Sequence, residues 1–231
     1  MAGPAQDHAL RCGAMGDVWA IVVAGGSGSR FGDCVPKQFL DLGGLRVIDW
    51  AVAAAGAACD GVVAVLPAAH LSATLPVGVV PVAGGATRSE SVRAGLSAVP
   101  DDAAVVVVHD AARPLADPAL FERVVGAVRA GADGAVPGVP VPDTVKRVDS
   151  AGRVVETPDR GALRAVQTPQ AFRADVLRRA HAGAGEATDD AALVEAAGGA
   201  VVVVDGDPSN LKITGPDDLV RAEILLARRS Q

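Results

Sequence analysis

The stretch that decides the fold is Val18-Trp-Ala-Ile-Val-Val-Ala-Gly-Gly-Ser-Gly-Ser-Arg30, an apolar run that leads directly into a glycine-rich loop. A short apolar run rich in β-branched side chains is typical of a strand buried on both faces of a parallel sheet. The loop predicts a phosphate-binding site, because only glycine allows backbone N–H groups to close around an anion. It is not a dinucleotide fingerprint, since Phe31 occupies the third glycine position, and it lacks the Gly-Lys-Ser/Thr of a P-loop. A plain tight turn is the alternative.

Similar apolar runs alternate with longer alanine-rich segments along the rest of the chain. We predict strands at 18–24, 61–66, 79–82, 104–109, 134–141 and 200–204, and helices at 46–58, 89–98, 117–130, 173–181, 189–197 and 216–229. Alternation of this kind predicts βαβ units and an α/β fold, in which helices cover a mostly parallel sheet.

Residues 137–169 interrupt the alternation with five prolines and two short alternating runs, 144–148 and 153–156, which a turn at 149–152 separates. This pattern predicts a β-hairpin that is too polar for the core and projects as an arm over about 137–165. A hairpin of this length is marginal by itself. Two interpretations stay open, a floppy surface insertion and a dimerisation arm.

Composition narrows the function further. The chain has 231 residues, a net charge of −6 and 50% hydrophobic residues. The length and the hydrophobic content predict one domain with a buried core, 18–231, and we expect residues 1–17 to form a flexible tail. The acidic balance argues against a general nucleic-acid binder. Three cysteines without a CxxC spacing disfavour a disulfide framework or a zinc cluster. No apolar run is long enough to predict a membrane span, and the tail lacks the apolar core of a signal peptide, so we expect a cytoplasmic protein. Translation could start at Met1 or at Met15.

Two cations lie in or just after the glycine loop. Arg30 lies within it and Lys37 follows it, a pair that suits a polyphosphate, although both could be solvated loop charges. Only three of the 21 basic residues are lysines, Lys37, Lys146 and Lys212, which suggests that these positions need a compact ammonium group.

Two further segments follow strands. In Val108-His-Asp-Ala-Ala-Arg-Pro114, Asp110 and Arg113 lie at the carboxyl end of a strand, where ligands gather in open α/β sheets. Asp110 could meet a magnesium ion or a ligand hydroxyl, or pair with Arg113 as a structural turn, and we interpret His109 as a core residue. Gly84-Gly-Ala-Thr-Arg-Ser-Glu-Ser-Val92 could present backbone groups to a base and ribose, or be an ordinary loop and helix cap.

Taken in order, these motifs resemble the 2-C-methyl-D-erythritol 4-phosphate cytidylyltransferases of the non-mevalonate isoprenoid pathway. The resemblance spans Val18 to about Arg228, with small departures at Gly25, Ala86 and Ala94. It rests on the following motifs: Ala24-Gly-Gly-Ser-Gly-Ser-Arg30, Pro36-Lys-Gln-Phe39, Arg88-Ser-Glu-Ser-Val92, His109-Asp-Ala-Ala-Arg-Pro114, Asp143-Thr-Val-Lys146, Thr168-Pro-Gln170, Thr188-Asp-Asp190 and Asn210-Leu-Lys-Ile-Thr214.

The resemblance implies a Rossmann-like nucleotidyltransferase domain, a three-layer sandwich, and a homodimer in which the arm reaches the partner. It assigns CTP to Ala24, Gly25, Gly26, Gly28, Gly85, Ala86, Ser91 and Ala111, with Arg30 and Lys37 on the phosphates as catalytic groups. It assigns the acceptor to Asp110, Arg113, Thr144, Arg160 and Lys212, of which Arg160 and Lys212 hold the attacking phosphate; Thr168 is a further substrate-binding candidate. Mg²⁺ is expected on the CTP phosphates, with its protein ligands unassigned.

The implied reaction transfers CMP from CTP to 2-C-methyl-D-erythritol 4-phosphate, giving 4-diphosphocytidyl-2-C-methyl-D-erythritol and pyrophosphate. The alternatives are a ribitol 5-phosphate cytidylyltransferase and a non-catalytic CTP-binding module. The expected partners are therefore CTP and a polyol phosphate, without nucleic acid or membrane.

Overall fold

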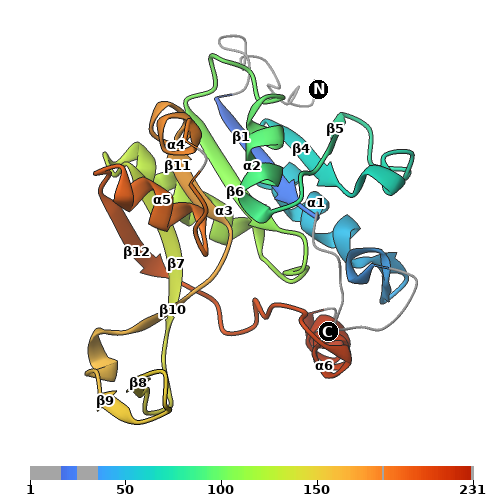
Figure 1. Ribbon diagram of the computed structural model, residues 1–231. Helices are drawn as coiled ribbons and strands as arrows, with labels where there is room; N and C mark the ends of the chain where they lie inside the picture. The colour runs from blue at the N-terminus through green and yellow to red at the C-terminus, as the bar shows by residue number, and fades with distance from the viewer. Residues whose placement is uncertain (1–16, 25–35, 184, 230–231) are drawn as a thin grey trace, which may run out of the picture.

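The computed structural model describes residues 17–24, 36–183 and 185–229. One eight-stranded sheet runs through the molecule (Figure 1) in the order β10-β7-β11-β6-β1-β4-β5, with β12 also paired to β7. Its strands are β1 (Val18–Val23), β4 (Gly61–Leu66), β5 (Val79–Ala83), β6 (Val105–Asp110), β7 (Gly134–Pro140), β10 (Arg164–Val166), β11 (Gln170–Arg173) and β12 (Val201–Asp205). All six predicted strands are therefore confirmed.

The sheet is parallel in its centre and mixed toward one side. Strand β1 lies between β4 and β6 and is parallel to both, β5 continues the parallel part, and β12 runs parallel to β7. Strands β10 and β11 are antiparallel to their neighbours. The carboxyl ends of β1 and β6 therefore lie side by side, which places Asp110 next to the end of the strand that leads into the glycine loop.

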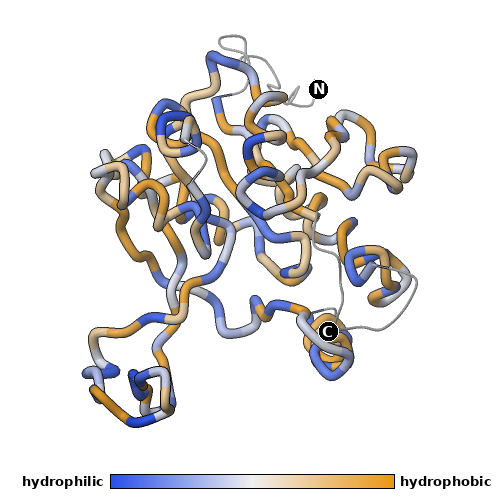
Figure 2. The backbone as a smooth tube through the Cα atoms, viewed as in Figure 1, coloured by the Kyte–Doolittle hydropathy of each residue, from blue (hydrophilic) through white to orange (hydrophobic). Residues whose placement is uncertain are grey.

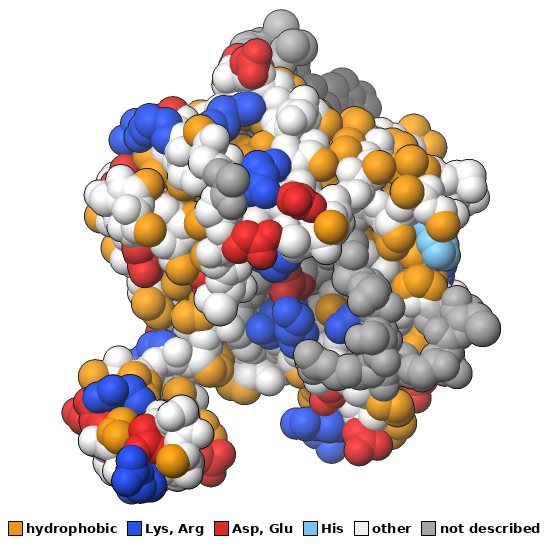
Figure 3. Space-filling view, viewed as in Figure 1, with side chains coloured by type: hydrophobic (Ala, Val, Ile, Leu, Met, Phe, Trp, Pro, Cys, Tyr) orange, Lys and Arg blue, Asp and Glu red, His pale blue; other side chains and the backbone are white. Residues whose placement is uncertain are grey.

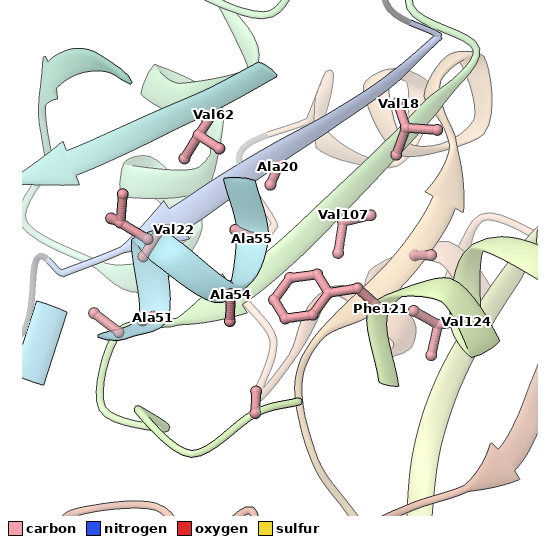
Figure 4. Close-up of a cluster of buried hydrophobic side chains, with 14 of the residues drawn as sticks. Val18, Ala20, Val22, Ala51, Ala54, Ala55, Val62, Val107, Phe121 and Val124 are labelled. Carbon is pink, nitrogen blue, oxygen red and sulfur yellow. The ribbon is translucent and has the colours of Figure 1, made fainter. Parts of the chain in front are cut away.

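Helices cover both faces of the sheet. Helices α1 (Val47–Ala58) and α3 (Pro118–Arg129) pack on one face, while α2 (Arg88–Leu96), α4 (Ala174–His181) and α5 (Asp190–Ala196) pack on the other. Figure 4 shows the first core, where Ala51, Ala54 and Ala55 of α1 face β1 and Phe121 of α3 fills the space beside them. Alanine on the helix and valine on the strands let the layers approach closely, because neither side chain is long. The predicted α/β three-layer arrangement is confirmed.

Local signals explain where several helices begin. Thr87 caps α2 and forms a capping box with Glu90, so that two otherwise unpaired backbone N–H groups have acceptors. Asp117 caps α3 directly before Pro118, which occupies the first helical turn, where its missing N–H is harmless. The Asp189 side chain caps α5.

The predicted arm is present and projects from one end of the sheet (Figure 1). Strands β8 (Arg147–Val148) and β9 (Val154–Glu156) form its hairpin, Gly152 in the turn has a φ of +78°, and the short 3-10 helix η3 (Arg160–Ala162) follows. Every residue of β8 and β9 is exposed. In Figure 2 the arm mixes hydrophilic and hydrophobic residues, whereas the central strands are mostly hydrophobic. The first and last residues of the predicted arm, 137–140 and 164–165, pair in the main sheet as parts of β7 and β10.

Some elements have no counterpart in the sequence prediction. Strands β10 and β11 return the chain from the arm into the sheet, and β11 inserts between β6 and β7. A small hairpin of β2 (Asp41–Leu42) and β3 (Leu45–Arg46) forms a third core with helix α6 (Pro216–Arg229), next to the 3-10 helix η1 (Lys37–Phe39). Another 3-10 helix, η2 (Ala68–His70), follows β4. These pieces are too short to show a repeating hydrophobic pattern.

Candidate functional site

Two adjoining cavities lie at the carboxyl ends of β1 and β6. The larger, about 330 Å³, falls within the size range of small-molecule sites, and the smaller is about 170 Å³. Arg88, Asp110 and Lys212 line both, so these side chains stand at the junction. The larger cavity is also lined by Val23, Ala24, Lys37, Gln38, Ala86, Thr87, Ser91, Ala111 and Ala112.

Asp110, the last residue of β6, is the centre of the junction. Its Oδ2 accepts a hydrogen bond from Lys212 Nζ at 2.6 Å, and its Oδ1 lies 3.4 Å from Arg88 Nε. Burial would raise the pKa of this carboxyl group, but the charges of Arg88 and Lys212 outweigh it and hold the pKa at about 2. Asp110 is therefore an anion at neutral pH and an acceptor for hydroxyl groups, not an acid that donates a proton.

The segment that follows the glycine loop brings Lys37 to the larger cavity. Lys37 Nζ donates a hydrogen bond to the carbonyl oxygen of Ile213 at 2.8 Å, which directs the ammonium group along the cavity wall. Buried Gln38 donates from Nε2 to the carbonyl oxygen of Ala24, so it fixes the segment against the end of β1. This anchoring explains why a glutamine follows the lysine.

The loop before α2 forms another part of the wall of the larger cavity. Glu90 Oε2 accepts from the backbone N–H of Ala86 at 2.6 Å and of Thr87 at 3.2 Å, which shapes the loop. Gly85 is required there, because a Cβ at this position would lie 2.4 Å from Glu90 Cβ. Ser91, in the first turns of α2, lines the same wall. The predicted base-side residues Ala86 and Ser91 thus face the cavity, and Gly85 permits the turn that presents them.

His109 is a buried connector and not a base. Its Nε2 lies 3.1 Å from the carbonyl oxygen of Arg113 and must carry a hydrogen, so Nδ1 accepts from Thr168 Oγ1 at 3.1 Å. Burial lowers the pKa of His109 to about 4. The Thr168 hydroxyl also accepts from the backbone N–H of Asp110 at 3.0 Å. Thr168 lines the smaller cavity, yet its hydroxyl hydrogen is already used by His109.

Arg113 supplies a third cation to the smaller cavity, besides Arg88 and Lys212. Its Nη1 donates to the carbonyl oxygen of Asn210 at 2.8 Å, while its buried Nε has no partner among the described residues. Burial lowers the pKa of Arg113 from its usual value, as expected where its charge is incompletely compensated. The smaller cavity therefore offers cationic donors suited to an anionic group.

Other predicted residues lie away from the cavities. Thr144 and Arg160 are on the arm, where Arg160 Nη1 donates to the carbonyl oxygen of Pro142 at 2.9 Å, and neither lines either of the two site cavities. Gly25, Gly26, Gly28 and Arg30 lie outside the described residues, as does most of the predicted tail, 1–16.

Sequence reasoning quoted Arg88 within a motif but gave it no role, and it assigned none to Gln38. Arg88 is the first residue of α2, where a cation opposes the positive end of the helix dipole. This unfavourable placement of an arginine was visible in the sequence, and it could have indicated that Arg88 pairs with carboxylates elsewhere in the fold. The smaller cavity likewise contains unassigned polar side chains: Gln167, Gln170, Thr188 and Asp189.

Cations outnumber anions around the two cavities. Lys37, Arg88, Arg113 and Lys212 line them against the carboxylates of Asp110 and Asp189. Basic side chains also gather in the middle of the face shown in Figure 3, between the arm and α6. Such a cleft suits two anionic ligands held close together. No group of three His, Cys, Asp or Glu side chains that could hold a metal occurs among the described residues.

Comparison with known proteins points to one family. A family model described as "IspD: 2-C-methyl-D-erythritol 4-phosphate cytidylyltransferase" matches residues 18–228. Relatives of that name from Nocardia farcinica and Rhodococcus jostii are 51% and 50% identical, covering 93% and 91% of this chain and 96% of their own lengths.

Solved structures agree with the sequence comparison. The cytidylyltransferase of the same name from Thermus thermophilus has a TM-score of 0.75 at 41% identity, over 90% of this chain and 98% of that one. The 4-diphosphocytidyl-2C-methyl-D-erythritol synthase from Anaerococcus prevotii has a TM-score of 0.79 at 29% identity, over 91% and 98%. In the described part of this chain, no helix is long and apolar enough to span a bilayer.

Proposed function

The chain belongs to the 2-C-methyl-D-erythritol 4-phosphate cytidylyltransferase family, and from this premise we infer that it transfers CMP from CTP to 2-C-methyl-D-erythritol 4-phosphate and releases pyrophosphate. The family match over 18–228 carries this inference. The cationic double cavity at the ends of β1 and β6 supports it, since the reaction brings two phosphorylated substrates together.

We propose that CTP occupies the larger cavity. Ala24, Ala86, Ser91 and Ala111 line it with small groups that permit close approach of a nucleotide. Gly85 permits the turn that forms the wall. The resemblance assigns further CTP contacts to Gly25, Gly26, Gly28 and Arg30, which lie outside the described residues. Lys37 would then meet the triphosphate, because its ammonium group lines the same cavity.

The acceptor would occupy the smaller cavity. Arg113 and Lys212 offer donors to its phosphate, and the Asp110 carboxylate can accept from its hydroxyl groups. Thr168 would contribute by fixing the backbone of Asp110, since its hydroxyl already bonds His109 and Asp110 N–H. The two substrates would therefore meet at the junction.

The reaction needs positioning more than proton transfer. A phosphate monoester has a second pKa of about 6 and is largely dianionic at neutral pH, so its oxygen attacks the α-phosphorus of CTP without a general base. The P–O bond to pyrophosphate breaks as the new P–O bond forms. Lys37 and Arg30 would stabilise the negative charge on the α-phosphoryl oxygens, and Lys212 with Arg160 would hold the attacking phosphate in line.

We propose that Mg²⁺ accompanies CTP. The described residues fit this, because the larger cavity offers one carboxylate, Asp110, and most Mg²⁺ ligands in nucleotide sites are phosphate oxygens and water. When bound, the ion neutralises charge on the triphosphate and its leaving group.

We also propose that a homodimer completes the site. Thr144 and Arg160 stand on an exposed arm away from the cavities of their own chain, and the arm exposes Val148, Val154 and Val155. An exposed apolar hairpin is more stable against a partner surface than in water. Exchanged arms would bring Arg160 to the neighbour's acceptor cavity. We place the reaction in the cytoplasm, where CTP is available, and the net charge of −6 favours small substrates over nucleic acid.

The test follows pyrophosphate release from CTP and Mg²⁺ by the purified chain. Separate reactions contain 2-C-methyl-D-erythritol 4-phosphate, ribitol 5-phosphate or no acceptor. We expect release with the first acceptor only. Release with ribitol 5-phosphate alone would change the acceptor and keep the CTP chemistry. CTP binding by calorimetry without release in any reaction would make the chain a nucleotide-binding module.

A further inference from the structure

Arg88 occupies a position that is electrostatically unfavourable for an isolated helix. As the first residue of α2 it places a cation at the positive end of the helix dipole, and its side chain is mostly buried. Burial works against its charge, but Asp190 and Asp110 outweigh it and raise the pKa of the guanidinium group. Arg88 is therefore held there by two carboxylates.

Asp190 is the anchor of this arrangement. Its side chain is completely buried at the start of α5, its Oδ2 lies 2.8 Å from Arg88 Nη2, and its Oδ1 accepts from His181 Nε2 at 3.0 Å. The contact with Arg88 is an ion pair, not an aligned hydrogen bond. A buried carboxylate with a fixed histidine on one oxygen has little freedom to turn, so it fixes the guanidinium group as well.

The fixed guanidinium reaches the junction of the two cavities. Arg88 Nε lies 3.4 Å from Asp110 Oδ1, and Lys212 holds the other oxygen of the same carboxylate at 2.6 Å. A carboxylate offers about four lone-pair sites, so two cations orient it and leave acceptor sites directed into the cavities. A chain of contacts thus runs from His181 through Asp190 and Arg88 to Asp110.

We propose that Arg88 is a positioning residue for the acceptor: anchored by the buried Asp190–His181 pair, it holds the Asp110 carboxylate where that group accepts hydrogen bonds from acceptor hydroxyls. The proposal rests on the proposed function. It deepens that function by naming the residues that orient Asp110, which are Arg88 and the buried Asp190–His181 pair behind it.

A purely structural role is the competing explanation, because the same ion pair joins α2 to α5. The two explanations differ in what they predict for the substrates. If the ion pair only joins the two helices, its loss lowers stability and impairs the kinetics with CTP and with the acceptor to the same extent. A positioning residue affects the acceptor selectively, and its effect disappears when Asp110 can no longer form the contact.

The first variant is Arg88→Lys, which keeps the charge beside Asp190 and loses the fork that spans the two carboxylates. We expect kcat/KM for the acceptor to fall by about 10- to 100-fold, as for a displaced positioning group, with the KM for CTP within about twofold. Arg93→Lys, in the same helix and outside both cavities, is the matched control and should match the wild type.

A second pair of variants tests the anchor. His181→Gln retains an N–H that can reach Asp190, whereas His181→Leu removes it. We expect the glutamine to preserve acceptor kinetics and the leucine to reproduce the Arg88→Lys defect. Thermal unfolding of each variant defines the temperature at which all are folded, so that kinetics are compared on native protein.

A mutant cycle with Asp110→Asn decides between the explanations. In that background Arg88→Lys should add less than about twofold to the acceptor defect, because the contact is already lost. The proposal is overturned if the defects of Arg88→Lys and Asp110→Asn multiply in the double variant. It is also overturned if Arg88→Lys lowers kcat/KM equally for CTP and the acceptor, or leaves the acceptor kinetics unchanged. Wild-type turnover with 2-C-methyl-D-erythritol 4-phosphate is measured in parallel, so that failure of the proposed function is seen separately as a silent wild type.

Discussion

The cleft at the carboxyl ends of β1 and β6 and the projecting β8–β9 arm are both rich in ion pairs, but in opposite settings. In the cleft, Asp110 and Asp190 have side chains that are 13% and 0% exposed. In the arm, the paired side chains of Arg147 and Glu156 are 66% and 49% exposed. Breaking a buried pair leaves an uncompensated charge in a poorly solvated place, whereas an exposed pair is replaced by water at little cost.

The cleft and the arm are therefore held in place by different kinds of contact. The cleft is fixed within one chain by contacts among β6, α2, α5 and the segment after β12. The arm has no buried residue in its hairpin and is held by its own turn and surface pairs. We therefore expect the arm to depend on the proposed partner and the cleft to depend on its own chain.

Lys37→Ala should give the largest effect, because it removes a cation from the cleft. We expect kcat/KM to fall by about 10²- to 10³-fold, or roughly 2.7–4 kcal/mol, as when one donor to a developing oxyanion is lost. Steady-state pyrophosphate release measures it. Arg129→Ala, an exposed residue at the far end of α3, is the control and should stay near wild type. Near-normal turnover by Lys37→Ala would show that the cleft lysine does not act on the phosphates.

Acid should weaken the buried region through His109. The pKa of His109 is lowered to about 4 in the folded chain from an ordinary value of 6.5, so the unfolded state binds the proton first as the pH falls. Stability is then lost between about pH 7 and pH 4, by about 3 kcal/mol from this group. Denaturant unfolding measures the loss.

The control for this prediction is His109→Gln, whose amide N–H can reach the carbonyl oxygen that accepts from His109 Nε2. Its stability at pH 7 is expected to be lower, with a smaller decrease toward pH 4. Parallel pH profiles for the two proteins would contradict a buried neutral imidazole.

Arg160→Ala should damage the arm's contribution while sparing the cleft. We expect the acceptor KM to rise by about tenfold, since one charge-assisted contact to phosphate is lost, and CTP affinity to stay within about twofold. Calorimetry with CTP and kinetics with the acceptor measure the two effects.

Mixing Arg160→Ala with Lys37→Ala sharpens the comparison further. If arms are exchanged, each mixed dimer contains one intact site. At acceptor concentrations well below KM, where Arg160→Ala alone is impaired about tenfold, random exchange should then restore about a quarter of wild-type activity. No recovery in verified mixed dimers would place Arg160 outside the neighbour's site.

Arg147→Gln should have the smallest effect. Its ion pair with Glu156 is exposed, so we expect the free energy of unfolding to change by less than about 1 kcal/mol, and we expect this difference to shrink further at high ionic strength, where salt screens the pair. Chemical denaturation at low and high ionic strength measures this. A loss comparable to that of Asp190→Asn, which breaks a buried pair, would remove the contrast between the two regions.

Much of the fold could be predicted because local patterns dominate it. Strand β6 is buried along its whole length, and its first four residues, 105–108, form an apolar valine run that predicts it. Helix α3 begins where Asp117 and Pro118 indicate. The placement of β11 between β6 and β7 could not be predicted. A four-residue strand shows no periodicity, and its partners are chosen by long-range pairing.

The candidate site likewise contains some residues that the sequence predicted and others that only the structure revealed. Asp110 and Lys212 were predicted as site residues because of their motifs, and the structure brings them within 2.6 Å although they are 102 positions apart. Arg88 was missed because an arginine at a helix start looks like a solvated charge. Its two carboxylate partners, Asp110 and Asp190, come from two other elements, β6 and α5.

The sequence alone determined the layered α/β fold, the exposed arm and the residues that favour a phosphate-rich site, since these follow from periodicity, turn chemistry and charge type. Only the tertiary structure decided the strand order, the neutral state of His109 and the partners of Asp110. Those depend on which distant groups share a poorly solvated space, and the energy of a charge depends on that environment more than on its neighbours in the chain.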